Sequence, residues 1–117
     1  MNVRDLMLAA QTESERREYF VRLEVLDLTT HLVKLRIYLT ATLFVQVYRN
    51  DRFGTTNLAL IHNSQRVFAR DELDGKWHRH PVATQDEHDT SPEGRRAVTL
   101  EEFLDEVEDI LAQSNLP

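Results

Sequence analysis

The chain has 117 residues, of which 41% are hydrophobic and 29% are charged, and its formal net charge is −6. These values are typical of a single globular domain over 1–117, and they exclude collagen-like and wholly disordered chains. The absence of cysteine excludes disulfide scaffolds, thiolate metal sites and cysteine nucleophiles. No apolar run approaches the ~20 residues of a membrane span, and the N-terminal run is too short for a signal peptide. We therefore expect a cytoplasmic protein with no membrane partner.

The negative charge is concentrated in the C-terminal quarter of the chain. Residues 86–109 contain ten acidic and two basic side chains, whereas residues 1–85 contain ten acidic and twelve basic ones. An acidic protein is not expected to bind nucleic acid. The mildly basic remainder weakens this objection without removing it.

The N-terminal segment predicts helical structure. Apolar side chains recur at helical spacing from Val3 to Ala10. Thr12 and Glu15 then have the spacing of a capping box, which would open a second helical stretch that ends near Phe20. The pattern does not decide between one helix and two.

From about Leu23 the apolar period changes to two, which is typical of strands with one buried face. Turn residues such as Asp74 and Gly75 separate the alternating runs. Strands are expected over 33–39, 43–48, 58–62, 66–71 and 76–80, and 23–29 is a candidate for one more.

The C-terminal region predicts a long surface loop over 82–97 and a helix over 99–113. Thr99 and Glu102 form a second candidate capping box, and one apolar stripe follows it. The fold class is therefore α+β, an antiparallel sheet of four to five strands with an N-terminal helix and a C-terminal amphipathic helix packed on one face. The acidic face of this helix is either solvated or in contact with a basic partner, such as the arginines of the sheet, another subunit or an antitoxin.

Strand alternation predicts which side chains share a face of the sheet. In the two central strands the odd positions are apolar and face the helices, so the even positions line the open face. The expected core includes Val33, Leu35, Ile37, Val45, Val47, Leu104 and Val107. If the later strands keep this order, the open face holds Lys34, Arg36, Tyr38, Gln46, Tyr48, Phe68, Arg70, His78 and His80. The core side then holds Val67, Ala69 and Trp77.

The motif Trp77-His78-Arg79-His80-Pro81 carries the most chemical information. Histidines at positions i and i+2 of a strand point the same way. They could form half of a metal site, which a downstream loop would complete through Asp86, Glu87, His88 or Asp89. They could also be structural, as surface residues of a strand that Trp77 anchors and Pro81 ends.

The third interpretation is cleavage of RNA without a metal or another cofactor. One imidazole would take the proton of the 2′-hydroxyl and an acid would protonate the leaving oxygen. Arginines would stabilise the negative charge that grows on the phosphate. The catalytic candidates are His78, His80 and Arg70. The phosphate-binding candidates are Arg36, Arg79, Lys34 and Tyr48.

Three segments carry a resemblance to a known group. They are FVQVYRN (44–50), LALIHNSQRVFARDELDGKWHRHP (58–81) and TLEEFLDEVEDIL (99–111). The chain resembles small uncharacterised prokaryotic proteins close to the TumE-type toxins of toxin–antitoxin systems. The matching positions are Arg36, Arg66, Arg70, Asp71, Trp77, His78, His80 and Pro81. The resemblance implies a compact α+β fold of the RelE-like ribonuclease kind and a toxin role opposed by a neighbouring antitoxin.

We therefore expect a small toxin-like endoribonuclease whose partners are RNA and an antitoxin protein. The alternative is a non-enzymatic interaction module, a homodimer whose open sheet face is the interface.

Overall fold

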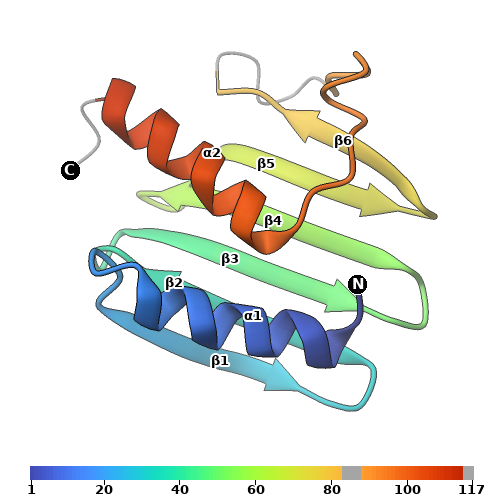
Figure 1. Ribbon diagram of the computed structural model, residues 1–117, viewed down its shortest axis with the longest axis horizontal. Coiled ribbons are helices and arrows are strands. Elements are labelled where there is room, and N and C mark those ends of the chain that lie inside the picture. Colours follow the sequence, from blue (N-terminus) through green and yellow to red (C-terminus); the bar gives the residue numbers. More distant parts are fainter. Residues whose placement is uncertain (83–87, 115–117) are drawn as a thin grey trace.

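The computed structural model describes residues 1–82 and 88–114 of the chain. These residues form two helices and six strands (Figure 1). In chain order the elements are α1 (Val3–Arg16), β1 (Arg22–Leu28), β2 (Leu32–Tyr38), β3 (Leu43–Asn50), β4 (Thr55–His62), β5 (Gln65–Leu73), β6 (Lys76–His80) and α2 (Leu100–Gln113).

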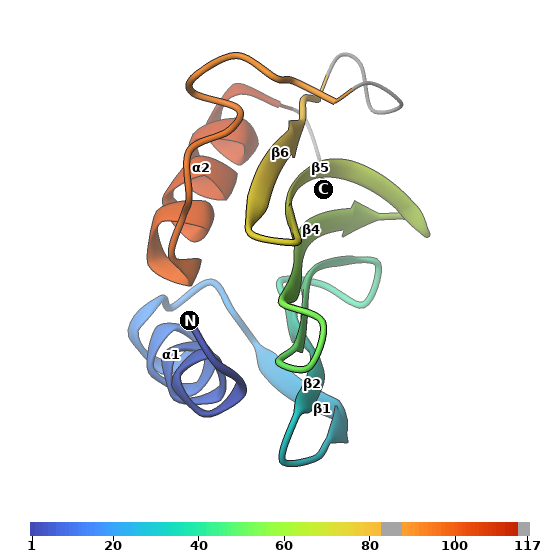
Figure 2. The same cartoon turned by 90° about the vertical axis from the view of Figure 1, so that its right-hand side faces the viewer.

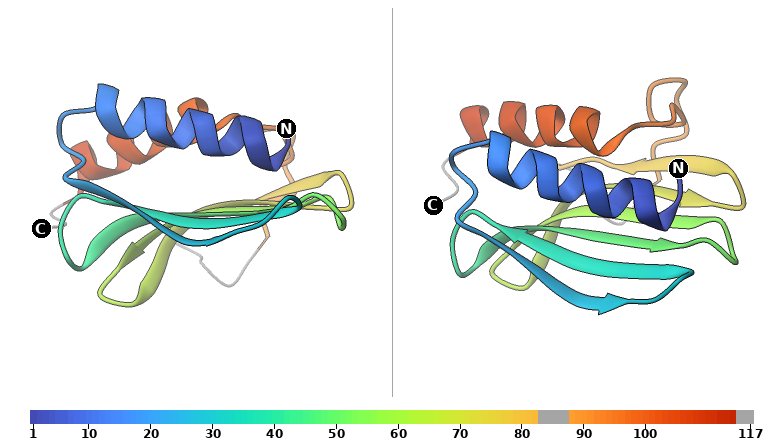
Figure 3. Two further views of the ribbon diagram at one scale, coloured as in Figure 1. Left: turned by 90° about the horizontal axis from the view of Figure 1, so that it is seen from below. Right: turned by 60° about the horizontal axis from the view of Figure 1, so that its bottom comes forward.

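The strands form one antiparallel sheet in which each strand pairs with the next along the chain. Both helices lie on the same side of this sheet (Figure 2), and the views in Figure 3 show them as one layer above it. The α+β class and the two helices are confirmed. The expected count of four to five strands is wrong, because β1 is a sixth. This edge strand is mostly exposed and has a register shift between Val25 and Asp27, so its alternation is weak in the sequence.

The N-terminal segment forms a single helix that ends at Arg16. Its N-cap is Asn2, whose side chain accepts a hydrogen bond from the backbone of Asp5. Thr12 lies inside α1, so the question of one helix or two is decided for one, and the helix ends before the expected end near Phe20. The buried face of the helix continues past Thr12 to Glu13, and that continuous contact outweighs the local capping signal.

The C-terminal helix begins where its capping box predicts. The Thr99 side chain accepts a hydrogen bond from the backbone of Glu102, and the Glu102 carboxylate accepts one from the backbone of Thr99. The helix packs its apolar stripe on the sheet, and the ring of Phe103 stacks on Phe68 of β5. All seven residues of the expected core are buried in one cluster.

The acidic face of α2 meets arginines of the same chain. The buried guanidinium of Arg17, which follows α1, lies 3.0 Å from Asp105 and 2.8 Å from Glu108. Arg96 lies 3.0 Å from Glu102. These ion pairs join α1 and the segment before α2 to the acidic face. Within the described parts of the chain, no helix is long and apolar enough to cross a membrane.

Candidate functional site

The register between neighbouring strands decides which side chains share a face, because directly opposite residues point the same way. Gln46 of β3 lies opposite Ala59 of β4, so the open face passes from even to odd positions between these strands. Ala59 lies opposite Ala69 of β5, and Ala69 lies opposite His80 of β6. The open face is therefore odd on β4, mainly odd on β5 and even again on β6. The expectation that even positions of the later strands lie on the open face is wrong for Phe68 and Arg70 of β5 and right for His78 and His80 of β6.

Arg70 consequently lies on the helix side of the sheet, not beside the two histidines. Its side chain is fully buried, and its Nε and Nη2 atoms donate to the two carboxylate oxygens of Glu106 on α2 at 3.0 and 2.7 Å. Its Nη1 donates to the backbone oxygen of Glu93 at 2.7 Å. Phe68 is on the same side, whereas Ala69 faces away from the helices. Arg70 thus joins the sheet to α2.

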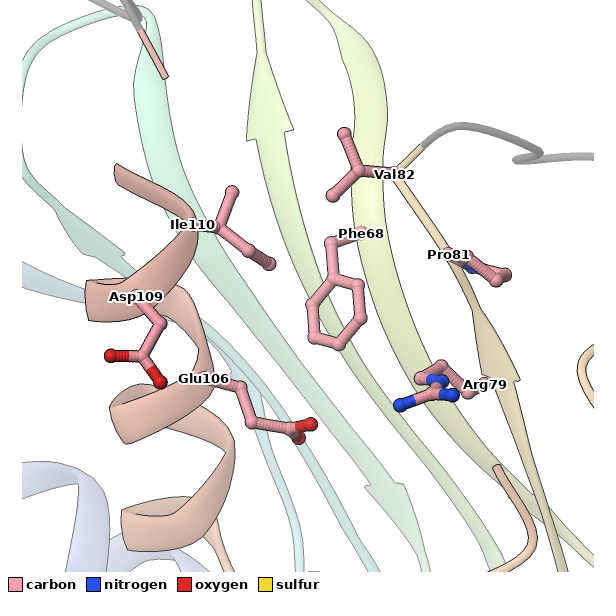
Figure 4. A pocket seen from close by; sticks show the side chains of 7 residues that line it. All are labelled: Phe68, Arg79, Pro81, Val82, Glu106, Asp109 and Ile110. Atoms are coloured by element: carbon pink, nitrogen blue, oxygen red, sulfur yellow. The ribbon is translucent and has the colours of Figure 1, made fainter. Parts of the chain in front are cut away.

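Arg79 is also on the helix side, although it lies between the two histidines in the sequence. Figure 4 shows its side chain at a groove between β6 and α2, across from Glu106 and Ile110. Its Nε donates to Asp89 at 2.8 Å. Hydrogen bonds from Ser91, together with this guanidinium, lower the pKa of Asp89 to about 2. Arg79 therefore binds Asp89 in the segment after β6, and it lies on the opposite face of the sheet from His78 and His80.

Lys34, Arg36 and Tyr48 lie on the open face as expected, but on β2 and β3. Four strand spacings separate β2 from β6, which is roughly 19 Å. The Arg36 guanidinium lies over the ring of Phe44, 4.6 Å from its centroid, and its Nε donates to Gln46 at 3.2 Å. These side chains share a face with the histidines without contacting them.

His80 is buried and held at both ring nitrogens. Its Nε2 lies 2.9 Å from a carboxylate oxygen of Asp71, and its Nδ1 lies 3.3 Å from Nη2 of Arg66. A guanidinium can only donate, so Nδ1 accepts and the ring proton is on Nε2, which donates to Asp71. The other carboxylate oxygen of Asp71 accepts a hydrogen bond from the Asn57 amide. The orientation of the His80 ring is therefore fixed by two residues of β5.

His78 and His88 complete a group of three imidazoles, which we name the histidine cluster (His78, His80 and His88). The ring of His88 lies 5.0 Å from that of His78 and 4.6 Å from that of His80, measured between centroids. An antiparallel bridge between Asp89 and Arg79 brings this segment back against the edge of β6. Nδ1 of His78 is buried and has no hydrogen-bond partner among the described residues.

The alternation in the sequence does not predict that Asp71 and Arg66, the hydrogen-bond partners of His80, lie on the open face. Val67 is an extra residue in the pairing of β4 with β5, since Leu60 lies opposite Phe68 whereas Ile61 lies opposite Arg66. This bulge puts Arg66 on the same face as Asp71 despite its even number. The Gly- and Asn-containing turns show where the strands end, but no signal in the sequence fixes the register of each pair.

Only some of the candidate metal ligands lie within the described residues. Asp86 and Glu87 lie outside the described residues. Within 1–82 and 88–114, no group of three or more His, Asp or Glu side chains could hold a metal ion. In this arrangement His80 has no ring nitrogen directed at a metal, because Nε2 is hydrogen-bonded to Asp71 and Nδ1 to Arg66.

Comparisons with models of known protein families, with curated proteins and with solved structures gave no match. The relationship to TumE-type toxins stays a prediction from the three sequence segments.

Proposed function

We propose that this protein is a metal-free endoribonuclease that cleaves RNA at the histidine cluster. The observation that carries the proposal is the meeting of three imidazoles on one face, with an unpartnered Nδ1 on His78. Histidine titrates near neutral pH, so paired imidazoles can act as the base and the acid of one reaction.

The chemistry needs two proton transfers at one phosphodiester. One imidazole takes the proton of the 2′-hydroxyl, and the 2′-oxygen attacks phosphorus as the bond to the 5′-oxygen breaks. The second imidazole gives a proton to that leaving oxygen, so the products are a 2′,3′-cyclic phosphate and a 5′-hydroxyl. We assign these two roles to His78 and His88, whose rings are adjacent and which are not held by a carboxylate in the described residues.

His80 has a positioning role in this proposal. Its nitrogens are engaged by Asp71 and Arg66, and its ring meets the ring of His88 edge-on, with 77° between the ring planes. The Asp71–His80 hydrogen bond thus fixes the surface against which His88 packs. Arg66 places a positive charge beside the cluster, where negative charge would develop on the phosphate. It takes the role that the sequence assigned to Arg70 and Arg79.

The charge distribution weakens the main objection to an RNA substrate. Five of the six acidic side chains of α2 are paired on the helix side with Arg16, Arg17, Arg70 or Arg96. The sheet separates them from the open face, where Lys34 and Arg36 of β2 lie opposite Asp27 and Glu24 of β1. The face that would meet RNA is therefore less acidic than the net charge suggests.

The proposed biological role is that of a toxin restrained by an antitoxin protein. Expression without the antitoxin should slow cell growth, and His78→Ala should relieve this effect. Purified protein should cleave single-stranded RNA in EDTA and leave the 2′-deoxy analogue intact, because the attacking group is the 2′-hydroxyl. If the wild type neither slows growth nor cleaves RNA, free or on ribosomes, the proposal is wrong.

A homodimeric interaction module is the second candidate function. Four large apolar side chains are exposed near the free edge of the sheet, on α1 and β1, namely Leu8, Val25, Leu26 and Leu28. This patch would place a dimer interface at the β1 edge and not on the open face. The test is the molar mass in solution, measured by light scattering for the wild type and for Leu28→Lys.

A further inference from the structure

A row of polar side chains crosses the open face and ends at the histidine cluster. Each member lies directly opposite the next on the neighbouring strand, so all of them point the same way. We name this set the polar row, which consists of Lys34, Tyr48, Asn57, Asp71 and His78. It runs across five strands, roughly 19 Å at the usual strand spacing.

We propose that the substrate is single-stranded RNA and that the strand crosses the sheet along the polar row, from Lys34 on β2 to His78 on β6. The proposal rests on the proposed function and adds the path of the RNA strand across the sheet. It needs three properties of the row: a cationic end, a ring beside that end on which a base can stack, and a reactive end.

The cationic end is formed by Lys34 and Arg36, which are successive even residues of β2. On the same face Asp27 of β1 lies opposite Lys34, and Glu24, which pairs with Arg22, lies opposite Arg36. Lys34 is half-buried, and among the described residues its ammonium forms no ion pair. Arg36 is held in place by Gln46 and by the ring of Phe44. Two cations side by side on a sheet are suited to successive phosphates of one strand.

The ring beside the cationic end is Tyr48, which lies opposite Lys34. Other aromatic side chains of this face are covered, since the guanidinium of Arg22 lies 4.1 Å from the centre of the Tyr38 ring and Arg36 lies over Phe44. Tyr48 is half-buried, and no ring or guanidinium of the described residues stacks on it. A base of a single strand can stack on such a ring, whereas the bases of an A-form duplex are stacked on one another and inaccessible. This contrast favours the single strand over the duplex.

The reactive end of the row is His78, and Asn57 and Asp71 lie between it and Tyr48. The Asp71 carboxylate would repel a phosphate, but its two oxygens accept hydrogen bonds from the Asn57 amide and from His80. His78 lies opposite Asp71, and beyond it the row meets His88. A strand bound by Lys34 and Tyr48 would therefore deliver a phosphodiester a few nucleotides away to the imidazoles.

The test is binding, measured by fluorescence anisotropy with a 2′-O-methyl single strand that cannot be cleaved. Lys34→Gln should weaken binding and reduce the slope of log K against log salt by about 0.7, the effect of losing one phosphate contact on a single strand. Arg4→Gln, which removes one charge from the exposed side of α1, should leave binding unchanged. Tyr48→Leu should weaken binding by roughly 5- to 100-fold through lost stacking, whereas Tyr48→Phe keeps the ring and should bind like the wild type.

Three results would overturn the path. The first is wild-type affinity in both Lys34→Gln and Tyr48→Leu, the second is no binding by the wild type, and the third is equal competition by a duplex of the same sequence. Histidine-dependent cleavage combined with any of these results would leave the proposed function standing and reject the path. Loss of binding in both variants without any cleavage by the wild type would support the path and reject the nuclease.

Discussion

Asp71 of β5 lies directly opposite His78 of β6 and yet forms its hydrogen bond diagonally, with Nε2 of His80 at 2.9 Å. One carboxylate therefore borders both histidines of the motif. It orients His80 and leaves Nδ1 of His78 without a partner among the described residues. The two histidines share a face and have different environments, which is why they receive different roles.

Arg70→Met should lower the free energy of unfolding by roughly 3–5 kcal/mol, because it breaks a buried ion pair and leaves Glu106 uncompensated. The matched control is Arg96→Met, which removes an exposed arginine paired with Glu93 and Glu102 and should cost ~0–1 kcal/mol. Urea unfolding followed by circular dichroism measures both. Equal small losses in the two variants would contradict the structural role of Arg70.

Leu104→Ala should destabilise the protein by ~2–5 kcal/mol, because the fully buried side chain lies in the single core between α2 and the sheet. The same urea titration measures the loss. The exposed Leu8→Ala on α1 should cost far less and serves as the control. A loss at Leu104 no larger than at Leu8 would contradict the packing of α2.

The stability contribution of Glu13 should depend on pH. The hydrogen bond from Arg16 lowers the pKa of this carboxyl to about 2, from an ordinary value of 4.5, with burial opposing and Arg17 adding to the effect. Because the pKa is lower in the folded state, the contribution is complete above about pH 4.5 and is lost as the pH falls towards 2.

The measurement is the difference in unfolding free energy between the wild type and Glu13→Gln. This difference should be constant from pH 7 to about pH 5 and should shrink at lower pH, since protonated Glu13 and Gln are both neutral. A difference that does not change between pH 5 and pH 2.5 would show that the ion pairs of Glu13 do not stabilise the fold.

Local patterns in the sequence predicted the elements that depend on local physics. The capping box at Thr99 and the apolar stripe after it define α2, and the alternation in β2 and β3 places their core side chains correctly. The sequence pattern leaves one helix or two open before Phe20, and packing of α1 on the sheet, which outweighs a capping signal of about 1 kcal/mol, decides for one.

The candidate site could be predicted only in part. The common face of His78 and His80 follows from the period of a strand, whatever its neighbours do. The face of Arg70 depends on the registers of two strand pairs and on the bulge at Val67, and its partner Glu106 is 36 residues away along the chain. Pairing over such separations leaves no local trace in the sequence, so Arg70 was placed on the wrong face.

The most direct test of the proposed nuclease is the single-turnover rate of RNA cleavage in EDTA for His78→Ala and for His31→Ala. His31 is exposed beside the β1–β2 turn, far along the chain from the cluster, and controls for the loss of an imidazole. The wild type and His31→Ala should cleave at the same rate, and His78→Ala should be slower by ~10²–10⁴-fold, as expected for a residue that transfers a proton. Cleavage at the wild-type rate by His78→Ala, or no cleavage by the wild type, would contradict the central claim.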